Sequence, residues 1–285
     1  MIRAWVLVFV FAGTKVAVAD AVRDCARGGS EAIAACTEAL RSYPDESTLY
    51  YNRAGAYIDT GLDTDNIVHA ISDYTNAIKI DPKYGLAYTR RGDMYRISGD
   101  NDHAIADYTK AIAIYPENAV AYANRGLAYN AKGDLDRAIA DYSKTIEIDR
   151  PESDRDHDPT KTIELYPEYS TAYDNRGTAY GSKGDFDRAV ADYTKVIEMK
   201  PRYAVGYANR GSARAAKGDL NPAIADYTKA IEIDPGLIIV YFKRGATYEA
   251  RGDKELAIAD YRKYLTFNPT DGRTKDALLR LKATH

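Results

Sequence analysis

The sequence has few of the residues that build reactive or metal-binding sites. It contains two cysteines, and its four histidines lie far apart in the chain. These are His69, His103, His157 and His285. Zinc sites need Cys or His ligands at short spacings, and the sequence has no such spacing, no Gly-rich phosphate loop and no nucleophile elbow. It therefore predicts no metal, no cofactor and no catalytic residues, which indicates that the protein is not an enzyme.

Excess positive charge is also missing. The chain has 39 Lys and Arg residues against 42 Asp and Glu residues, a formal net charge of -3 at pH 7. Nucleic-acid binding needs a basic stripe that neutralises phosphates, and no part of the sequence offers one. Its aromatic residues are nearly all tyrosines at regular positions, as in a packed core. We therefore expect no nucleic-acid partner.

Long apolar runs are absent as well, apart from a short one between Ala4 and Ala12. This run is far shorter than the roughly 20 apolar residues that a membrane-spanning helix needs. Arg3 precedes it, and the A-x-A cleavage pattern Ala17-Val18-Ala19 follows it, which is typical of a bacterial secretory signal peptide. We expect cleavage after Ala19, export to the periplasm or beyond, and no stable membrane span after the signal is removed.

What the sequence does contain is a unit that recurs six times. In one copy Tyr122 and Gly126 lie on one face of a predicted helix, and Gly133 is suited to end that helix in a left-handed conformation. A second predicted helix follows, with Ala138 and Tyr142 on its apolar stripe. Two such short helices cannot bury both stripes alone, so each unit needs neighbours.

The first tyrosine of each unit returns at Tyr50, Tyr88, Tyr122, Tyr173, Tyr207 and Tyr241. The usual step is 34 residues, and the order of aromatic, small, alanine and proline positions resembles the tetratricopeptide repeat family. The resemblance covers roughly residues 46–271. It implies an all-α, right-handed superhelical solenoid of antiparallel helix-turn-helix repeats, with a C-terminal capping helix and a concave groove for protein or peptide partners.

Each position that recurs from copy to copy is called a column here, and the columns divide the chain into a series of segments. We expect a signal peptide at 1–19, a degenerate N-terminal repeat at 20–45, full repeats at 46–84, 85–118, 119–169, 170–203, 204–237 and 238–271, and a capping helix at 272–285. The third full repeat carries a 17-residue insertion, of which 150–159 is charged and bounded by prolines. We expect a loop there, either a recognition element or a tolerated insertion.

Both cysteines fall in the degenerate repeat. Ala32 occupies its alanine column and Cys36 its tyrosine column, so Cys25 on the preceding short helix can face Cys36 across a helical hairpin. An exported protein meets an oxidising compartment, which favours a structural disulfide between Cys25 and Cys36. In the chain-entropy model, a disulfide that closes so short a loop stabilises the folded state by about 3 kcal/mol.

Two charged columns recur in every full copy, an arginine on the first helix and an aspartate before the second-helix tyrosine. The arginines are Arg53, Arg91, Arg125, Arg176, Arg210 and Arg244. The aspartates are Asp73, Asp107, Asp141, Asp192, Asp226 and Asp260. An arginine that enters a helix interface needs a carboxylate, so we interpret the columns as structural ion pairs. The alternative is a row of arginines for acidic partners, and the exposure of the guanidinium groups distinguishes the two.

One residue before each arginine lies a mainly polar column, on the face that the resemblance assigns to the partner-binding groove. Its members are Asn52, Arg90, Asn124, Asn175, Asn209 and Lys243. An amide offers a donor and an acceptor, so a row of Asn can bind the backbone of an extended peptide. Equally, these residues could be solvated polar positions. The family's complete carboxylate clamp is missing, since the positions of its other residues are occupied by Tyr51 and Gly55 or Asp174 and Thr178.

These patterns favour a non-catalytic scaffold that binds a partner protein or an extended peptide in the groove. The alternative function is an accessory subunit of an envelope enzyme complex that acts on peptidoglycan or polysaccharide.

Overall fold

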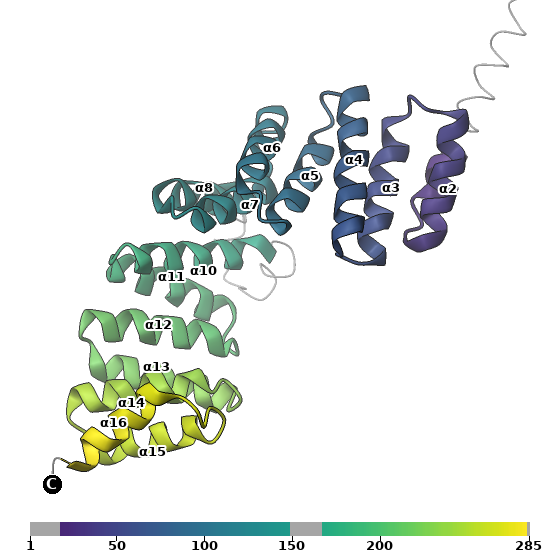
Figure 1. Ribbon diagram of the computed structural model, residues 1–285. Helices are drawn as coiled ribbons and strands as arrows, with labels where there is room; N and C mark the ends of the chain where they lie inside the picture. The colour runs from purple at the N-terminus through teal and green to yellow at the C-terminus, as the bar shows by residue number, and fades with distance from the viewer. Residues whose placement is uncertain (1–17, 149–166, 284–285) are drawn as a thin grey trace, which may run out of the picture. The chain divides into compact units, whose positions relative to one another are not determined.

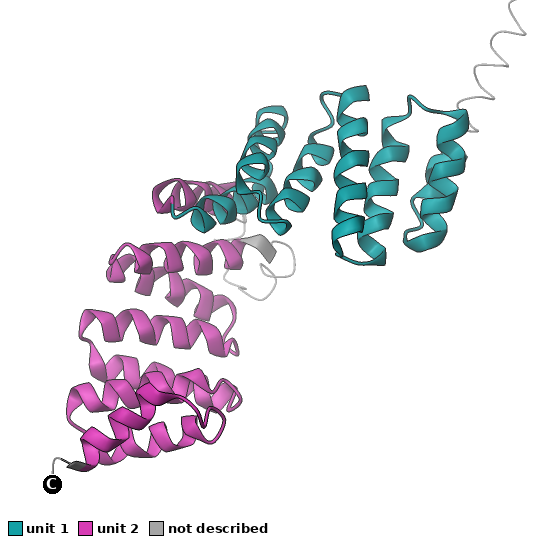
Figure 2. Ribbon diagram, in the orientation of Figure 1, with its two compact units in different colours: residues 1–133 teal, residues 134–285 magenta. Residues whose placement is uncertain are grey.

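The computed structural model describes residues 18–148 and 167–283, and every regular element in these ranges is a helix. The chain divides into two compact units, residues 1–133 and 134–285 (Figure 2). The expected all-α architecture is therefore confirmed, and each unit is described by itself below. The predicted signal peptide and the charged insertion at 150–159 fall outside the described residues, apart from the last two positions of the signal, Val18 and Ala19.

Unit 1 begins with a short helix at 18–25 and continues through six longer ones. These are α2 (Gly29–Ser42), α3 (Ser47–Thr60), α4 (Thr64–Ile80), α5 (Gly85–Ile97), α6 (Asn101–Ile114) and α7 (Ala119–Ala131). Successive helices pack side by side, α3 on α4 and α5 on α6 within a repeat, and α4 on α5 between repeats (Figure 1). The first helices α5 and α7 also touch, so first helices form a common face.

Unit 2 repeats this arrangement. Its helices are α8 (Leu135–Ile148), α10 (Pro167–Ser182), α11 (Phe186–Met199), α12 (Ala204–Lys217), α13 (Leu220–Ile233), α14 (Ile239–Arg251), α15 (Lys254–Leu265) and α16 (Gly272–Ala283). The first helices α10, α12 and α14 contact one another in order. The capping helix predicted from the sequence is α16, because its Ala277 and Leu281 form a buried cluster with Ala257 and Tyr261 of α15.

Two glycine positions explain how each helix pair forms. Gly218 ends α12 with φ 94°, a left-handed conformation that most residues avoid, and its N–H bonds to Ala215. Gly211 allows close packing, since a Cβ there would lie 2.9 Å from a ring carbon of Tyr227. The tyrosine of the second helix thus occupies the space that the small residue of the first helix leaves, and Tyr227 is 2 % exposed.

Three helix starts show how local residues set the element boundaries. Helix α4 is 17 residues long and is capped by Asp63, whose side chain accepts from the Asn66 N–H. Helix α2 starts at Gly29 with Gly28 as its N-cap. Helix α10 begins at Pro167, and Pro is suited to the first turn because it lacks an N–H.

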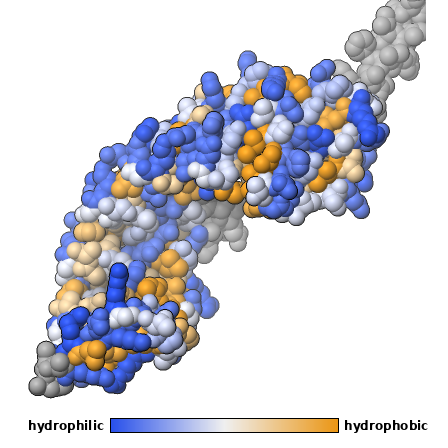
Figure 3. All heavy atoms as spheres, viewed as in Figure 1, coloured by the Kyte–Doolittle hydropathy of each residue, from blue (hydrophilic) through white to orange (hydrophobic). Residues whose placement is uncertain are grey.

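Side chains on the surface are mostly polar, with apolar residues interspersed in small groups on the face in view (Figure 3). The larger exposed apolar side chains of unit 1 include Leu86 at 58 % and Tyr115 at 57 %. None of the helices in residues 18–148 or 167–283 is long and apolar enough to cross a membrane.

Candidate functional site

The arginine column lies inside each unit and is paired. Arg91 donates from Nε and Nη2 to both carboxylate oxygens of Asp107 at 2.7 Å, and Arg244 does the same to Asp260 at 2.7 and 2.8 Å. Equivalent two-bond pairs join Arg53 to Asp73, Arg176 to Asp192 and Arg210 to Asp226. The pairs are within repeats. Of the remaining members of the two columns, Arg125 belongs to unit 1 and Asp141 to unit 2.

These guanidinium groups are poorly accessible. The exposed fraction of the paired arginine side chains runs from 14 % for Arg210 to 18 % for Arg53 and Arg176. Burial alone would lower the pKa of Arg91, but the hydrogen bond and charge of Asp107, together with the nearby Tyr95 and Tyr88, offset it, and the pKa is raised. The column is therefore engaged in the stack and offers little to an acidic partner.

A third contact of each arginine was not predicted. Its Nη1 donates to a hydroxyl on the second helix of the preceding repeat, from Arg91 to Thr75 at 2.9 Å and from Arg244 to Thr228 at 3.0 Å. The same bond joins Arg53 to Thr37, Arg125 to Thr109, Arg176 to Ser143 and Arg210 to Thr194. The sequence does carry the signal, since a Ser or Thr follows the second-helix column residue in every copy from Cys36 to Tyr227, whereas Arg262 follows Tyr261 in the last copy.

The disulfide predicted from the sequence is present between Cys25 and Cys36, whose Cα atoms lie 4.8 Å apart. Both residues are buried, at 1 % and 0 % exposure, and they form a core cluster with Leu40 and Leu49. The bond holds the short helix at 18–25 against α2. A helix of eight residues is not stable alone, so this tether and the cluster keep it in place.

The polar column of the expected groove connects neighbouring first helices. Asn124 Nδ2 donates to Asp93 Oδ1 at 2.9 Å, and Arg90 lies 3.6 Å from the same carboxylate. In unit 2, Asn209 Nδ2 donates to Asp174 Oδ1 at 3.3 Å. The other bonds of the column run from Asn52 to the Val22 carbonyl and from Lys243 to Ser212, while Asn175 is partly buried on α10. These side chains are therefore not simply solvated.

The residues that accept hydrogen bonds from this column also contact tyrosines of the second helices, which was not predicted from the sequence. Asp93 also accepts from Tyr108 Oη at 2.8 Å, and burial raises the pKa of this carboxyl. Ser212 accepts in the same way from Tyr227 at 3.3 Å, and Thr178 lies 3.1 Å from Tyr193 Oη. A polar network thus runs from the second-helix tyrosine, through one residue of the first helix, to the next repeat.

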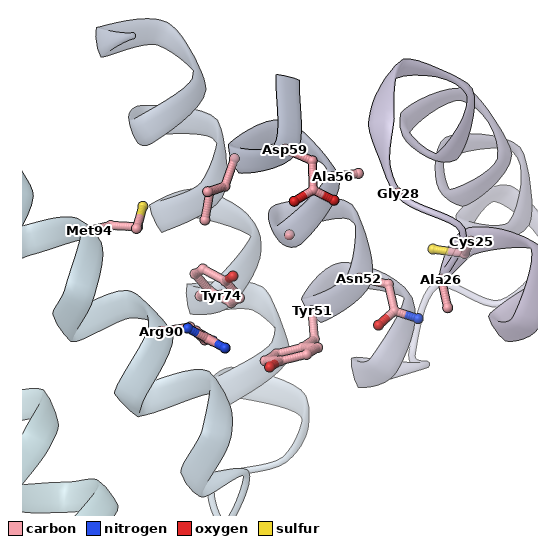
Figure 4. A pocket seen from close by; sticks show the side chains of 12 residues that line it. Cys25, Ala26, Gly28, Tyr51, Asn52, Ala56, Asp59, Tyr74, Arg90 and Met94 are labelled. Atoms are coloured by element: carbon pink, nitrogen blue, oxygen red, sulfur yellow. The ribbon is translucent and has the colours of Figure 1, made fainter. Parts of the chain in front are cut away.

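Unit 1 has a cavity of about 330 Å³ where this face meets the helix at 18–25. Tyr51, Asn52 and Asp59 project from α3, Arg90 and Met94 from α5, and Tyr74 lies between the two helices (Figure 4). Tyr51 packs on Tyr74 with ring centroids 5.5 Å apart. Gly55 leaves room on the α3 side, since a Cβ there would meet no atom within 4 Å.

Unit 2 has a comparable cavity of about 270 Å³ on its own first-helix face. Thr178 and Gly181 contribute from α10, Phe186 and Tyr193 from α11, Asn209 and Ser212 from α12, and Lys243 from α14. Four of the six predicted groove residues therefore line a cavity: Asn52, Arg90, Asn209 and Lys243.

Neither cavity is lined by a set of side chains suited to bind a metal ion. Within residues 18–148 and 167–283, no group of three His, Cys, Asp or Glu side chains could hold a metal ion. His69 stacks on Tyr57, and His103 stacks on Tyr95 and contacts Asp100 at 2.7 Å, which are packing and capping roles. His157 and His285 lie outside the described residues.

Family models match most of the repeats found above. A model described as tetratricopeptide repeat matches residues 119–150, a second one matches 170–203 and 238–271, and a model described as TPR repeat matches 92–133 and 211–252. Together they cover more than half of the chain, which therefore belongs to the tetratricopeptide repeat family. The fold is one that serves as a scaffold for protein interactions. A comparison with curated protein sequences finds no match.

Solved structures support the same fold. The C-terminal part of a TPR repeat-containing protein from Cytophaga hutchinsonii is 22 % identical, covers 87 % of this chain and 94 % of its own, and has a TM-score of 0.66. The type IV pilus biogenesis factor PilW is 20 % identical over 81 % and 98 %, with a TM-score of 0.64. YrrB, titled a TPR protein with an unusual peptide-binding site, is 20 % identical over 72 % and 95 %, with a TM-score of 0.57.

Proposed function

We propose that this chain is an exported, non-catalytic scaffold that binds an extended segment of a partner protein on its first-helix faces. The observation that carries the proposal is the pair of cavities, one in each unit, each lined by two residues of the polar column. YrrB is titled for a peptide-binding site, which supports peptide binding for a related fold.

The chemistry of this surface suits a peptide backbone. Asn52 and Asn209 line the cavities, and both donate from Nδ2 to a neighbouring first helix. In the described part of the chain their amide oxygens receive no hydrogen bond, so each can accept from a peptide N–H. Gly55 and Gly181 keep the cavities open beside them, because they place no side chain there. Sequence-tolerant binding through the backbone is the expected result.

Large side chains placed at these glycines test the proposal. Gly55→Trp and Gly181→Trp should fill the two cavities, since a Cβ at Gly181 comes no closer than 3.9 Å to another atom. Ala106→Trp and Ala225→Trp, on exposed second-helix positions, are controls of equal size. Peptides selected by display against the wild-type chain should lose binding to a cavity variant and keep binding to the controls. Equal binding to all four variants would refute the proposal.

A second experiment separates the groove from the insertion. Changing Asn124, Asn175 and Asn209 together to Ala should weaken binding of the selected peptides, since each hydrogen bond is worth about 0.5 to 1.5 kcal/mol. Some loss of stability is also expected, because Asn124 and Asn209 bind neighbouring carboxylates. Deletion of 152–158 should leave binding unchanged. If only the deletion abolishes binding, the insertion is the recognition element.

Export is the second part of the proposal. The buried disulfide supports it, since such bonds persist in oxidising compartments. Intact-mass analysis of protein from a bacterial envelope fraction should show a chain that begins at Asp20 and has no free thiol. A mass that includes residues 1–19, or two titratable thiols, would contradict it. Recovery of a peptidoglycan or polysaccharide enzyme with the chain would favour the accessory-subunit alternative.

A further inference from the structure

Lys243 is the charged residue that lines the cavity of unit 2, and it is partly buried there. Its Nζ donates to Ser212 Oγ at 2.9 Å. In the described ranges no carboxylate lies within salt-bridge distance of Nζ. Desolvation by burial lowers the pKa of this ammonium, as expected of a cation that lacks a counter-charge.

Other lysines of unit 2 show the contrast. Lys183 is paired with Asp136, Lys217 lies 2.6 Å from Asp187, and Lys229 lies 3.1 Å from Glu232. All of these are exposed, where an ion pair contributes little. Lys243 is the more buried group, and a neutral hydroxyl is its hydrogen-bond partner in the described structure.

The groups around Lys243 suit an anion of modest size. Ser212 supplies a hydroxyl beside Lys243, and Thr178 and Tyr193 contribute two more hydroxyls to the cavity wall. Phe186 and the small Gly181 make the remaining wall apolar and leave space. One ammonium with neutral hydrogen-bonding neighbours balances one negative charge, as in a carboxylate.

We propose that this cavity binds the side-chain carboxylate of an internal Asp or Glu in an extended peptide, with Lys243 as its counter-ion. The inference rests on the proposed function and gives its ligand a chemical class. The proposed ligand is not a C-terminal acidic residue, which carries one carboxylate on its side chain and a second one at the chain end. Asn209 is bonded to Asp174, so a second ligand carboxylate at Asn209 would lie close to a residue of like charge.

The test uses the full chain and short peptides whose ends are acetylated and amidated. Flanking positions are randomised among uncharged residues, and the central position is Glu, Gln or Lys. Binding is measured by fluorescence for the wild type, for Lys243→Met and for Lys229→Met. Lys229 lies on α13 and outside the cavity, so its variant controls for loss of a positive charge.

We expect the Glu peptides to bind about tenfold more tightly than the Gln peptides, the usual size of a charge-assisted hydrogen bond. Lys243→Met should abolish this preference, and Lys229→Met should retain it. Equal binding of Glu and Gln peptides to the wild type would overturn the inference but leave the proposed function standing. Preferential binding of matched peptides with a free C-terminus and no acidic residue would also overturn it. If no peptide binds, both proposals fail.

Discussion

The contact that most directly tests how these repeats are held together is the one made by Arg91. Its guanidinium gives two bonds to Asp107 and one to Thr75, and it lies over the rings of Tyr88 and Tyr95, 5.7 and 5.9 Å from their centroids. Arg91→Met keeps much of the aliphatic volume and removes the charge. The carboxylate of Asp107, 5 % exposed, then remains in the stack without its cation.

The size of the effect follows from these contacts. Breaking a buried ion pair from one side costs about 3 to 5 kcal/mol, because the remaining charge is uncompensated. The Arg91 side chain is 16 % exposed, so some solvent screening places the expected loss near the lower limit, about 3 kcal/mol. Thr75→Val removes a bond to the same guanidinium and leaves the ion pair, and it should cost about 1 kcal/mol.

Urea unfolding followed by circular dichroism gives the loss of stability, and hydrogen exchange locates it. Repeat proteins can unfold in parts, so exchange measured separately in α5 and α6 is the more direct measurement. We expect faster exchange in both helices of the Arg91→Met variant. The double variant Arg91→Met, Asp107→Leu should recover most of the stability, because apolar replacement of a whole buried pair is often nearly neutral.

A loss below about 0.5 kcal/mol for Arg91→Met, which is the range of exposed surface substitutions, would refute this reasoning. The guanidinium would then contribute little to the stack. The interpretation of the column as a row of arginines for acidic partners would have to be reconsidered.

Two further predictions concern packing and the disulfide. Gly55→Ala should raise stability by about 0.5 to 1 kcal/mol, since Ala is the better helix former and a Cβ there meets no atom within 4 Å, whereas Gly211→Ala should lower it because its Cβ would lie 2.9 Å from Tyr227. Thermal unfolding of the two variants checks this, and midpoints shifted in the same direction would contradict it. Changing Cys25 and Cys36 to Ser should cost about 3 kcal/mol locally and speed hydrogen exchange at 18–42 without changing α12 to α15. Unchanged exchange at 18–42 would show that packing alone holds the first helix.

Much of the fold could be predicted from the sequence because the same constraint is repeated six times. Each tyrosine of a second helix needs a small residue opposite it, and each buried arginine needs a carboxylate, so these columns stand out when the copies are aligned. The disulfide was predictable for a related reason, since Cys36 occupies the tyrosine column and faces the preceding helix.

The residues that accept hydrogen bonds from the polar column could not be predicted in this way. The accepting position on the first helix is Asp93 in one repeat and Ser212 in another. The same position is Gly55 where the unit 1 cavity opens. A position that changes from copy to copy gives no signal in a comparison of repeats. Its importance appears only when the side chains from neighbouring first helices are placed together, as in the bonds from Asn124 to Asp93 and from Lys243 to Ser212.

Stability and recognition therefore use neighbouring residues that point in different directions. Arg244 bonds to Asp260 and to Thr228 on second helices, whereas Lys243, one residue earlier, bonds to Ser212 on a first helix. Successive residues of a helix are rotated by about 100°, so adjacent columns can serve different interfaces. Substitutions at Lys243 should then alter ligand binding with little effect on unfolding, and substitutions at Arg244 should do the reverse. A variant of either residue that changed both properties equally would show that the two networks are coupled through the helix.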